Sequence, residues 1–174
     1  MIVLETERLR LWHLDPDTDT EFILRLVNER PFLHYIGDKG VRTLADARQY
    51  ITDGPQKSYE INGYGLYKVV LKSDGAAIGM CGLLKRDTLP DADIGFAFLE
   101  DYWNKGYAYE SAAATMQYAR EKLGIERVLA ITTPDNVASG KLLAKIGLRF
   151  DRLIKLTADA AEVKLFTTEK YESF

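Results

Sequence analysis

Two spacings of apolar residues, one of two residues and one near 3.6, divide the chain into predicted strands and helices. Polar and apolar residues alternate over 8–11 (RLRL), within the segment 4–14, which predicts a first strand there. Apolar residues then recur at helical spacing over 22–27, and Arg30 followed by Pro31 is expected to end that helix. Thr43, with Asp46 three residues later, resembles a capping box and predicts a second short helix.

The middle of the chain predicts three consecutive antiparallel strands. Aliphatic residues dominate 64–72 and 76–85, and the segment 73–75 (SDG) between them has the composition of a hairpin turn. A third strand is predicted over 93–99, after the turn-forming segment 89–91 (LPD).

The second half of the chain alternates between helical and strand patterns. The predicted elements are a long helix over 105–123, a strand over 127–133, a helix that Asp135 or Asn136 caps and that ends at Gly147, and a closing antiparallel pair at 149–157 and 162–168. Strands and helices in this order predict an α+β fold, in which helices cover the faces of a sheet.

Length and composition limit the possible classes of protein. A chain of 174 residues fits one domain, 1–174, and 47% hydrophobic with 28% charged residues is typical of a soluble globular protein. A net charge of −3 argues against a nucleic-acid partner. A single cysteine, Cys81, excludes an intrachain disulfide, and two histidines are too few for a histidine metal site. Without an apolar run of 18 residues or a signal segment, we expect no membrane partner and a cytoplasmic location.

The segment 99–110 (LEDYWNKGYAYE) carries the clearest functional signal. A predicted strand turns through Gly106 into a long helix, and such a turn presents unpaired backbone N–H groups at the positive end of the helix dipole. These groups suit a phosphate. Lys105 strengthens this interpretation, because a cation at a helix start is electrostatically misplaced unless an anion binds there too.

Residues 103–108 (WNKGYA) resemble the acetyl-CoA pyrophosphate loop of the GNAT N-acetyltransferases. Residues 136–139 (NVAS) and 147–150 (GLRF) resemble the second signature of the same superfamily. The opening 4–11 (LETERLRL), together with 102–103 (YW), is most similar to the RimJ/RimL branch, which includes enzymes that acetylate the N-termini of ribosomal proteins. The resemblance implies the GNAT fold, with a mixed, mostly antiparallel sheet of about six to seven strands and about four flanking helices.

The resemblance also implies acetyl-CoA as cosubstrate, with no metal. A diphosphate can bind the N–H groups of the loop, and the pantetheine arm can add to the edge of the strand before it. The cofactor-binding residues expected there are Phe96, Phe98, Leu99, Asn104, Lys105, Gly106, Tyr107 and Ala108. The resemblance further places Asn136 on the pantetheine arm and Ser139 near the sulfur. The alternative is that both residues only satisfy N–H groups at a helix end.

Direct transfer of an acetyl group to an amine needs a proton acceptor, because a free amine has a pKa of about 8–10.4. Asp93 occupies the strand position where several GNAT enzymes carry a catalytic glutamate, and it is the candidate base. Alternatively, it is only a solvated acid at a strand start. Many family members also place a proton-donating tyrosine seven residues after the asparagine. This chain has Leu143 there, which leaves Ser139 as the candidate donor.

Three further residues complete the candidate set. His34 and Tyr35 lie where this family usually lines its acceptor pocket, although a surface aromatic loop is an equal alternative. Cys81 lies in an apolar strand and is expected to be a packing residue, not an acyl carrier. We therefore expect an acetyl-CoA-dependent N-acetyltransferase that acts on a protein N-terminus or a small-molecule amine, as a monomer or homodimer. A non-catalytic acyl-CoA sensor and a structural domain without ligand are the alternatives.

Overall fold

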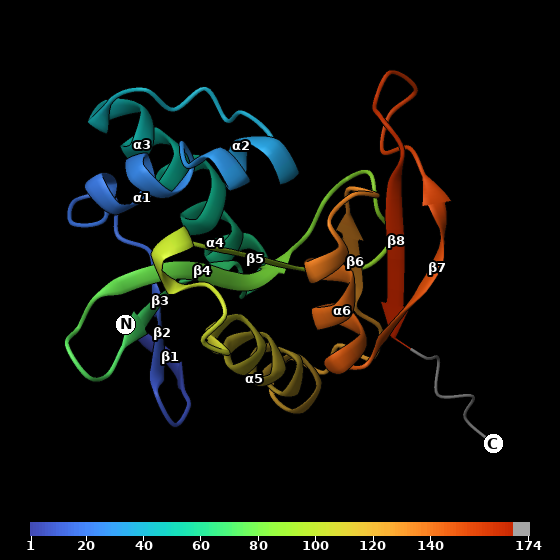
Figure 1. The fold of residues 1–174 in the computed structure, drawn as a ribbon. Coiled ribbons are helices and arrows are strands. Elements are labelled where there is room, and N and C mark those ends of the chain that lie inside the picture. The colour runs from blue at the N-terminus through green and yellow to red at the C-terminus, as the bar shows by residue number, and fades with distance from the viewer. Residues whose placement is uncertain (169–174) are drawn as a thin grey trace.

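A computed structural model describes residues 1–168, which form an α+β fold around one eight-stranded sheet (Figure 1). The strands are β1 Ile2–Glu5, β2 Leu9–His13, β3 Leu66–Leu71, β4 Ala77–Leu84, β5 Asp93–Phe98, β6 Leu129–Thr132, β7 Leu148–Ile154 and β8 Val163–Thr168. Their spatial order is β1-β2-β3-β4-β5-β6-β8-β7. All neighbouring pairs are antiparallel except β5 and β6, which are parallel. The predicted antiparallel run 64–99 and the closing pair are confirmed.

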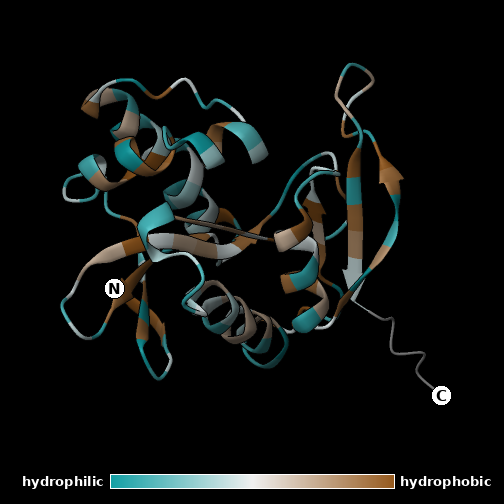
Figure 2. Cartoon of the chain, in the orientation of Figure 1, coloured by the Kyte–Doolittle hydropathy of each residue, from teal (hydrophilic) through white to brown (hydrophobic). Residues whose placement is uncertain are grey.

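Helices cover both faces of the sheet. They are α1 Thr20–Leu26, α2 Arg30–Tyr35, α3 Leu44–Ile51, α4 Lys57–Asn62, α5 Tyr107–Glu121 and α6 Val137–Lys145, with a π-helical segment η1 Thr52–Gln56 between α3 and α4 and a 3-10 turn η2 Glu100–Tyr102 before α5. Helices α1 to α4 gather on one face, and α5 lies across the other (Figure 1). Figure 2 shows apolar segments along the central strands and polar ones at the turn between β1 and β2.

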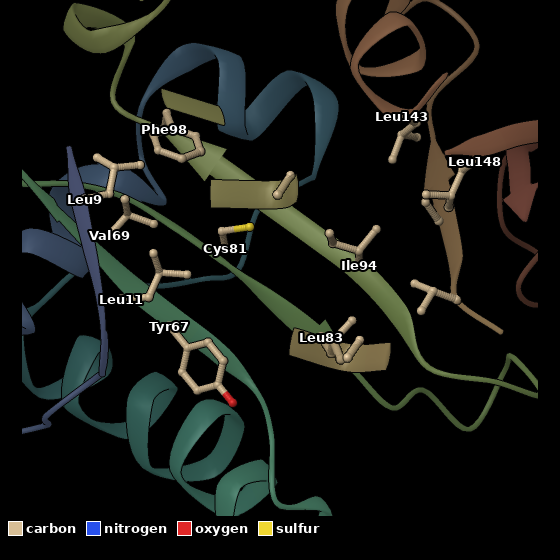
Figure 3. Packing of buried hydrophobic residues seen from close by; sticks show 14 of the residues in the cluster. Leu9, Leu11, Tyr67, Val69, Cys81, Leu83, Ile94, Phe98, Leu143 and Leu148 are labelled. Carbon is tan, nitrogen blue, oxygen red and sulfur yellow. The ribbon is translucent and has the colours of Figure 1, made fainter. Parts of the chain in front are cut away.

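Two apolar clusters hold these layers together. The first cluster lies between the sheet and helix α5 and includes Leu9, Leu11, Val69 and Cys81 (Figure 3). Helix α5 contributes small side chains, and Ala112 and Ala119 are fully buried. These small side chains form a stripe along the helix that lets it lie close to the strands.

The second cluster packs α1, α2 and α3 against the opposite face. Ile23, Phe32 and Ile51 meet Met80 of β4 and Leu99, the residue after β5. Because Met80 lies in β4 and Leu99 directly follows β5, this cluster fixes the α1–α3 layer next to the end of β5.

The predicted first strand, 4–14, is two strands. β1 and β2 form an antiparallel hairpin, in which the Thr6 N–H donates to the Leu9 carbonyl at 2.9 Å and the Thr6 hydroxyl accepts from the Leu9 N–H at 3.1 Å. Threonine side chains often form such bonds to nearby backbone groups, and these bonds favour a turn. The prediction of one strand rested on the alternation within 8–11, and it passed over the polar run 5–8 (ETER), where the turn lies.

The helical layer also differs from its prediction. The first helix ends at Leu26, as expected from the following proline, but Arg30 and Pro31 begin α2 because proline is tolerated in the first turn of a helix. The predicted capping box of α3 is confirmed: the Thr43 hydroxyl accepts from the Asp46 N–H at 3.1 Å, and the Asp46 carboxylate accepts from the Thr43 N–H at 3.0 Å. Helix α4 was not predicted, because Gly54 and Pro55 interrupt the pattern.

β5 and β6 separate soon after they begin. Their register holds one pair, Asp93 with Leu129, and the Leu129 N–H donates to the Ala92 carbonyl at 2.9 Å. Beyond this pair the edge of β5 runs toward α5 without a partner strand. Within 1–168, no helix is both long and apolar enough to cross a bilayer.

Candidate active site

The unpaired edge of β5 is the first part of the site. In an antiparallel pair, alternate residues direct both backbone groups toward the same neighbour. The Leu99 N–H donates to Ile78 on the β4 side at 2.9 Å, so Phe96 and Phe98 direct their groups toward the β6 side, past its single pairing. The Trp103 indole N–H donates to the Phe98 carbonyl at 3.0 Å, which ties the end of this edge to the following loop.

Leu99 does not share this edge. Its N–H donates to Ile78, and its carbonyl accepts from the Tyr102 N–H at 2.9 Å. Because both of its backbone groups bond within the protein, the geometry argues against the predicted backbone contact of Leu99 with a cofactor. Phe96 and the N–H of Phe98 remain available along the strand.

The turn from β5 into α5 is the second part of the site. Asn104 and Gly106 both have left-handed backbone angles, with φ of 60° and 81°. The predicted helix start at 105 shifts to Tyr107, and no side chain caps the helix. Among the described residues, none accepts a hydrogen bond from the N–H groups of residues 106–109. Four unpaired donors at a helix N-terminus form a binding site for an anion, as the turn of 103–108 predicted.

Lys105 folds back beside this turn. Its ammonium donates to the Asp101 carbonyl at 3.0 Å and lies 5.4 Å from the centre of the Tyr102 ring. The side chain is exposed and long enough to swing toward an anion at the helix start. Tyr107 and Ala108 occupy the first turn of α5, as predicted, and both are partly buried against the core.

The second signature forms the N-terminus of α6. Asn136 is the cap, and its side-chain oxygen accepts from the Ser139 N–H at 3.2 Å. The predicted cap is thus confirmed for Asn136, and its contact with the pantetheine arm stays a prediction. Ser139 uses its backbone for the cap, which leaves its hydroxyl out of that bond. Leu143, at the common tyrosine position, is buried in the core.

Asp93 starts β5 and is buried, with its side chain 1% exposed. The Arg86 Nε donates to both carboxylate oxygens, at 3.2 and 3.0 Å. Burial raises the pKa of Asp93, and the charge of Arg86 opposes part of that rise. Asp93 is therefore not a solvated acid. Arg86 was missed by the sequence reasoning, because it lies in the loop after β4 and no motif marks it.

Gly95 lies on the same face of β5 as Asp93, and a protein side chain lies close to it on that face. A Cβ added at Gly95 would lie 2.7 Å from the Leu84 Cδ1. Ala97, on the same face, packs in the cluster of α1 to α3. The glycine did signal a close approach, but the neighbour is a side chain of the protein.

His34 and Tyr35 end α2 on the face opposite α5. The His34 Nε2 lies 2.7 Å from the Asp135 carboxylate, and its ring meets Tyr35 edge-on at 4.6 Å. The Thr133 hydroxyl, which approaches Asp135 without full hydrogen-bond geometry, and His34 together lower the pKa of Asp135. Sequence reasoning treated Asp135 only as a possible cap. In the structure, it links α2 to the loop before α6.

Cys81 is fully buried, with its sulfur 3.5 Å from the Thr115 hydroxyl. Burial raises the pKa of this thiol to about 11. A thiol that is protonated and inaccessible at neutral pH cannot carry an acyl group. The packing role is therefore confirmed.

Comparison with known proteins decides the family. The model of the acetyltransferase (GNAT) domain family matches residues 8–149. The chain belongs to the GNAT acetyltransferases. Among its relatives is an uncharacterized N-acetyltransferase of Bacillus subtilis, YnaD, which is 27% identical over 79% of this chain and 77% of its own length.

Solved GNAT structures share the fold. An acetyltransferase of Agrobacterium tumefaciens superposes with a TM-score of 0.81 at 22% identity, over 97% of this chain and 95% of the other. A ribosomal L7/L12 α-N-protein acetyltransferase, RimL, crystallised with coenzyme A, superposes with a TM-score of 0.72 at 16% identity, over 96% of this chain and 97% of the other. The predicted fold class is confirmed, with eight strands in place of six to seven.

The residues of the site fit acetyl-CoA, the thioester donor of GNAT acetyltransferases. The four unpaired N–H groups at the start of α5 match a diphosphate, and the free edge of β5 matches an arm that contains amides. The two features are consecutive in the chain, so one extended ligand can occupy both.

Proposed function

We propose that this GNAT protein moves an acetyl group from acetyl-CoA directly to a primary amine. The proposal rests on the set of unpaired N–H groups at 106–109, which the short segment 99–105 joins to the open edge of β5. When bound, acetyl-CoA supplies an activated acetyl thioester. In this proposal the residues Asn104, Lys105, Gly106, Tyr107 and Ala108 hold its diphosphate, and Phe96 and Phe98 pair with its arm.

The donor and the acceptor approach from opposite faces of the sheet. The donor binds at the α5 side, and α2 with His34 and Tyr35 lies on the other side. Successive side chains of a strand alternate between faces, so Asp93 shares its face with Ala97, which packs toward α1–α3. Asp93 therefore belongs to the acceptor side, where a base is needed.

In the proposed reaction, Asp93 accepts the proton that the acceptor ammonium loses, directly or through water. Its raised pKa supports this role, because a carboxylate near its ordinary pKa of about 3.9 is a weak base at neutral pH. The amine nitrogen then forms a bond with the acetyl carbon, the carbon–sulfur bond breaks to release the thiolate, and the nitrogen loses its second proton to water. Ser139 donates a hydrogen bond to the departing sulfur, which needs only such help because a thiol has a pKa near 8.5.

We also propose that the chain belongs near the RimJ/RimL branch and acts on a protein N-terminus or a small-molecule amine. The opening 4–11, which resembles that branch, supports this placement. Helix α2 supports an acceptor pocket lined by His34 and Tyr35, since the His34–Asp135 contact brings it to the loop beside Asn136.

A thiol-release assay with acetyl-CoA and a panel of amines tests the proposal. The panel contains peptides with free N-termini, polyamines and aminoglycosides, with N-terminally blocked peptides as the matched control. We expect coenzyme A to be released only with free primary amines. Binding of coenzyme A without release from any amine would favour the sensor alternative, and no binding at all would contradict both.

A further inference from the structure

The turn between β1 and β2 is hydrogen-bonded to the first turn of α5. One oxygen of the Glu110 carboxylate accepts from the Thr6 hydroxyl at 2.6 Å and from the Arg8 N–H at 2.8 Å. The other oxygen accepts from the Arg8 Nε at 2.7 Å. Three hydrogen bonds thus join segments that lie about a hundred residues apart in the chain.

Arg8 continues from Glu110 to the turn before the helix. Its Nη1 donates to the Lys105 carbonyl at 2.9 Å, and its guanidinium lies 4.5 Å from the centre of the Tyr107 ring. Its Nη2 lies 3.2 Å from the position that a Cβ on Gly106 would take. The guanidinium therefore touches three consecutive residues of the loop.

The bond to the Lys105 carbonyl sets the direction of the next N–H group. In a trans peptide the carbonyl and the following N–H lie in one plane and point in opposite directions. A carbonyl held toward Arg8 therefore directs the Gly106 N–H away from Arg8, toward the open side of the turn. Gly106 has a left-handed φ of 81°, and an untethered glycine can adopt many other conformations.

Glu110 holds Arg8 in place for this task. Although burial raises the pKa of Glu110, the hydrogen bonds from Thr6 and Arg8 bring it below its ordinary value, so the carboxylate is ionised at neutral pH. An anion at this helix start would by itself repel a second anion. Its presence beside a diphosphate loop is explained if it anchors the arginine.

We propose that Arg8 is a positioning residue for the donor diphosphate, anchored by Glu110 and Thr6. It fixes the peptide between Lys105 and Gly106 so that the N–H groups of the turn converge on the anion. This inference rests on the proposed function, in which that turn holds the diphosphate. In this proposal, Thr6 and Arg8 of the 4–11 motif serve to position the diphosphate loop.

Calorimetric titration with coenzyme A tests the proposal in Arg8→Gln, Arg8→Lys and Glu110→Gln. We expect each variant to bind coenzyme A about tenfold more weakly, the effect of losing roughly one charge-assisted hydrogen bond. Lysine keeps the charge but lacks the planar fork that joins Glu110 to the Lys105 carbonyl. In Glu110→Gln, an amide NH₂ would face the Arg8 Nε, and two donors repel.

Arg10→Gln is the matched control. Arg10 lies on the same hairpin and pairs with Glu5 at 3.3 Å, and its side chain is as exposed as that of Arg8. We expect its affinity for coenzyme A to equal that of the wild type. Circular dichroism and thermal unfolding of every variant confirm that the fold is retained.

A charge-only role for Arg8 gives different results. Arg8→Lys would then bind like the wild type, and Glu110→Gln would bind more tightly, because a negative charge is removed beside the anion. Either result overturns the proposal. Wild-type affinity in Arg8→Gln would overturn it as well.

Acetyl-pantetheine, which lacks the diphosphate, separates this proposal from a general structural role. We expect Arg8→Gln to have the same kcat/KM for acetyl-pantetheine as the wild type. Its KM for acetyl-CoA should be higher than that of the wild type. An equal loss with both donors contradicts diphosphate positioning. If the wild type itself does not bind coenzyme A, the proposed function fails, whatever the Arg8 variants do.

Discussion

At the scale of single residues, the Asp93 carboxylate combines burial with a charged partner. It is 1% exposed, and the Arg86 Nε donates to both of its oxygens. Burial raises the pKa of Asp93 more than Arg86 lowers it. The pair thus keeps an acid in the sheet next to the separation of β5 and β6, with a pKa closer to neutral than that of an exposed aspartate.

Asp93→Asn tests the role of this acid as a base. We expect kcat to fall by about 10²-fold or more, because asparagine cannot accept a proton. A base must be ionised, so the wild-type rate should be lost as the pH falls through the raised pKa of Asp93. This limb of the pH–rate profile should be absent in the variant.

Asp91→Asn is the control for Asp93→Asn, since Asp91 lies in the loop just before β5, pairs with Arg127 at 3.1 Å and is outside the site. It should leave kcat and the pH profile unchanged. If the acidic limb of the profile persists in Asp93→Asn, another group is the base.

Variants of Ser139 and Asn136 distinguish a role in catalysis from a role in capping α6. Ser139 gives only its N–H to the cap, so Ser139→Ala should unfold like the wild type while kcat falls about five- to tenfold, the worth of roughly one hydrogen bond. Asn136→Ala removes the cap acceptor and should lower the free energy of unfolding by about 1 kcal/mol. Chemical denaturation and steady-state rates measure both. A wild-type kcat in Ser139→Ala would contradict its role at the sulfur.

At the scale of elements, two sharp turns define the donor site. The turn before α5 places Asn104 and Gly106 in left-handed conformations and ends in unpaired N–H groups. Arg8, from the turn between β1 and β2, holds the turn before α5 through its bond to the Lys105 carbonyl. A loop that must present its backbone to a ligand gains from such a tether, because ordering it on binding would cost conformational entropy.

Gly106→Ala tests the backbone requirement of that turn. Alanine at a φ of 81° costs roughly 1–2 kcal/mol of stability, and its Cβ would lie 3.2 Å from the Arg8 Nη2. Gly124→Ala is the matched control: Gly124 has a φ of 65°, lies just beyond the other end of α5 and has no atom within 4 Å of an added Cβ. We expect both variants to lose stability. Coenzyme A affinity, measured by calorimetry, should fall only in Gly106→Ala, and equal affinity in both would contradict the account.

At the scale of the whole molecule, local chemistry was predictable and distant pairing was not. The capping box of Thr43 and Asp46, the turn at Gly106 and the cap at Asn136 each depend on neighbouring residues, and the sequence predicted all three. The split of 4–14 into two strands involves a hydrogen bond to the Thr6 side chain. The spacing of apolar residues does not reveal such a bond.

The missed parts of the site are contacts between distant segments. Arg8 meets Glu110 from 102 residues away, and His34 meets Asp135 from 101 residues away. Arg86 reaches Asp93 from the loop after β4. Such pairs follow from the sheet order and from the packing of helices on opposite faces, and no local motif encodes them.

In the proposed site, the start of α5 and the edge of β5 together hold one thioester donor that carries a diphosphate. A crystal structure with coenzyme A tests it most directly. We expect diphosphate oxygens within hydrogen-bond distance of the N–H groups of residues 106–109, and the pantetheine arm along Phe96 and Phe98. A diphosphate bound elsewhere, or an arm that leaves the β5 edge unpaired, would contradict it.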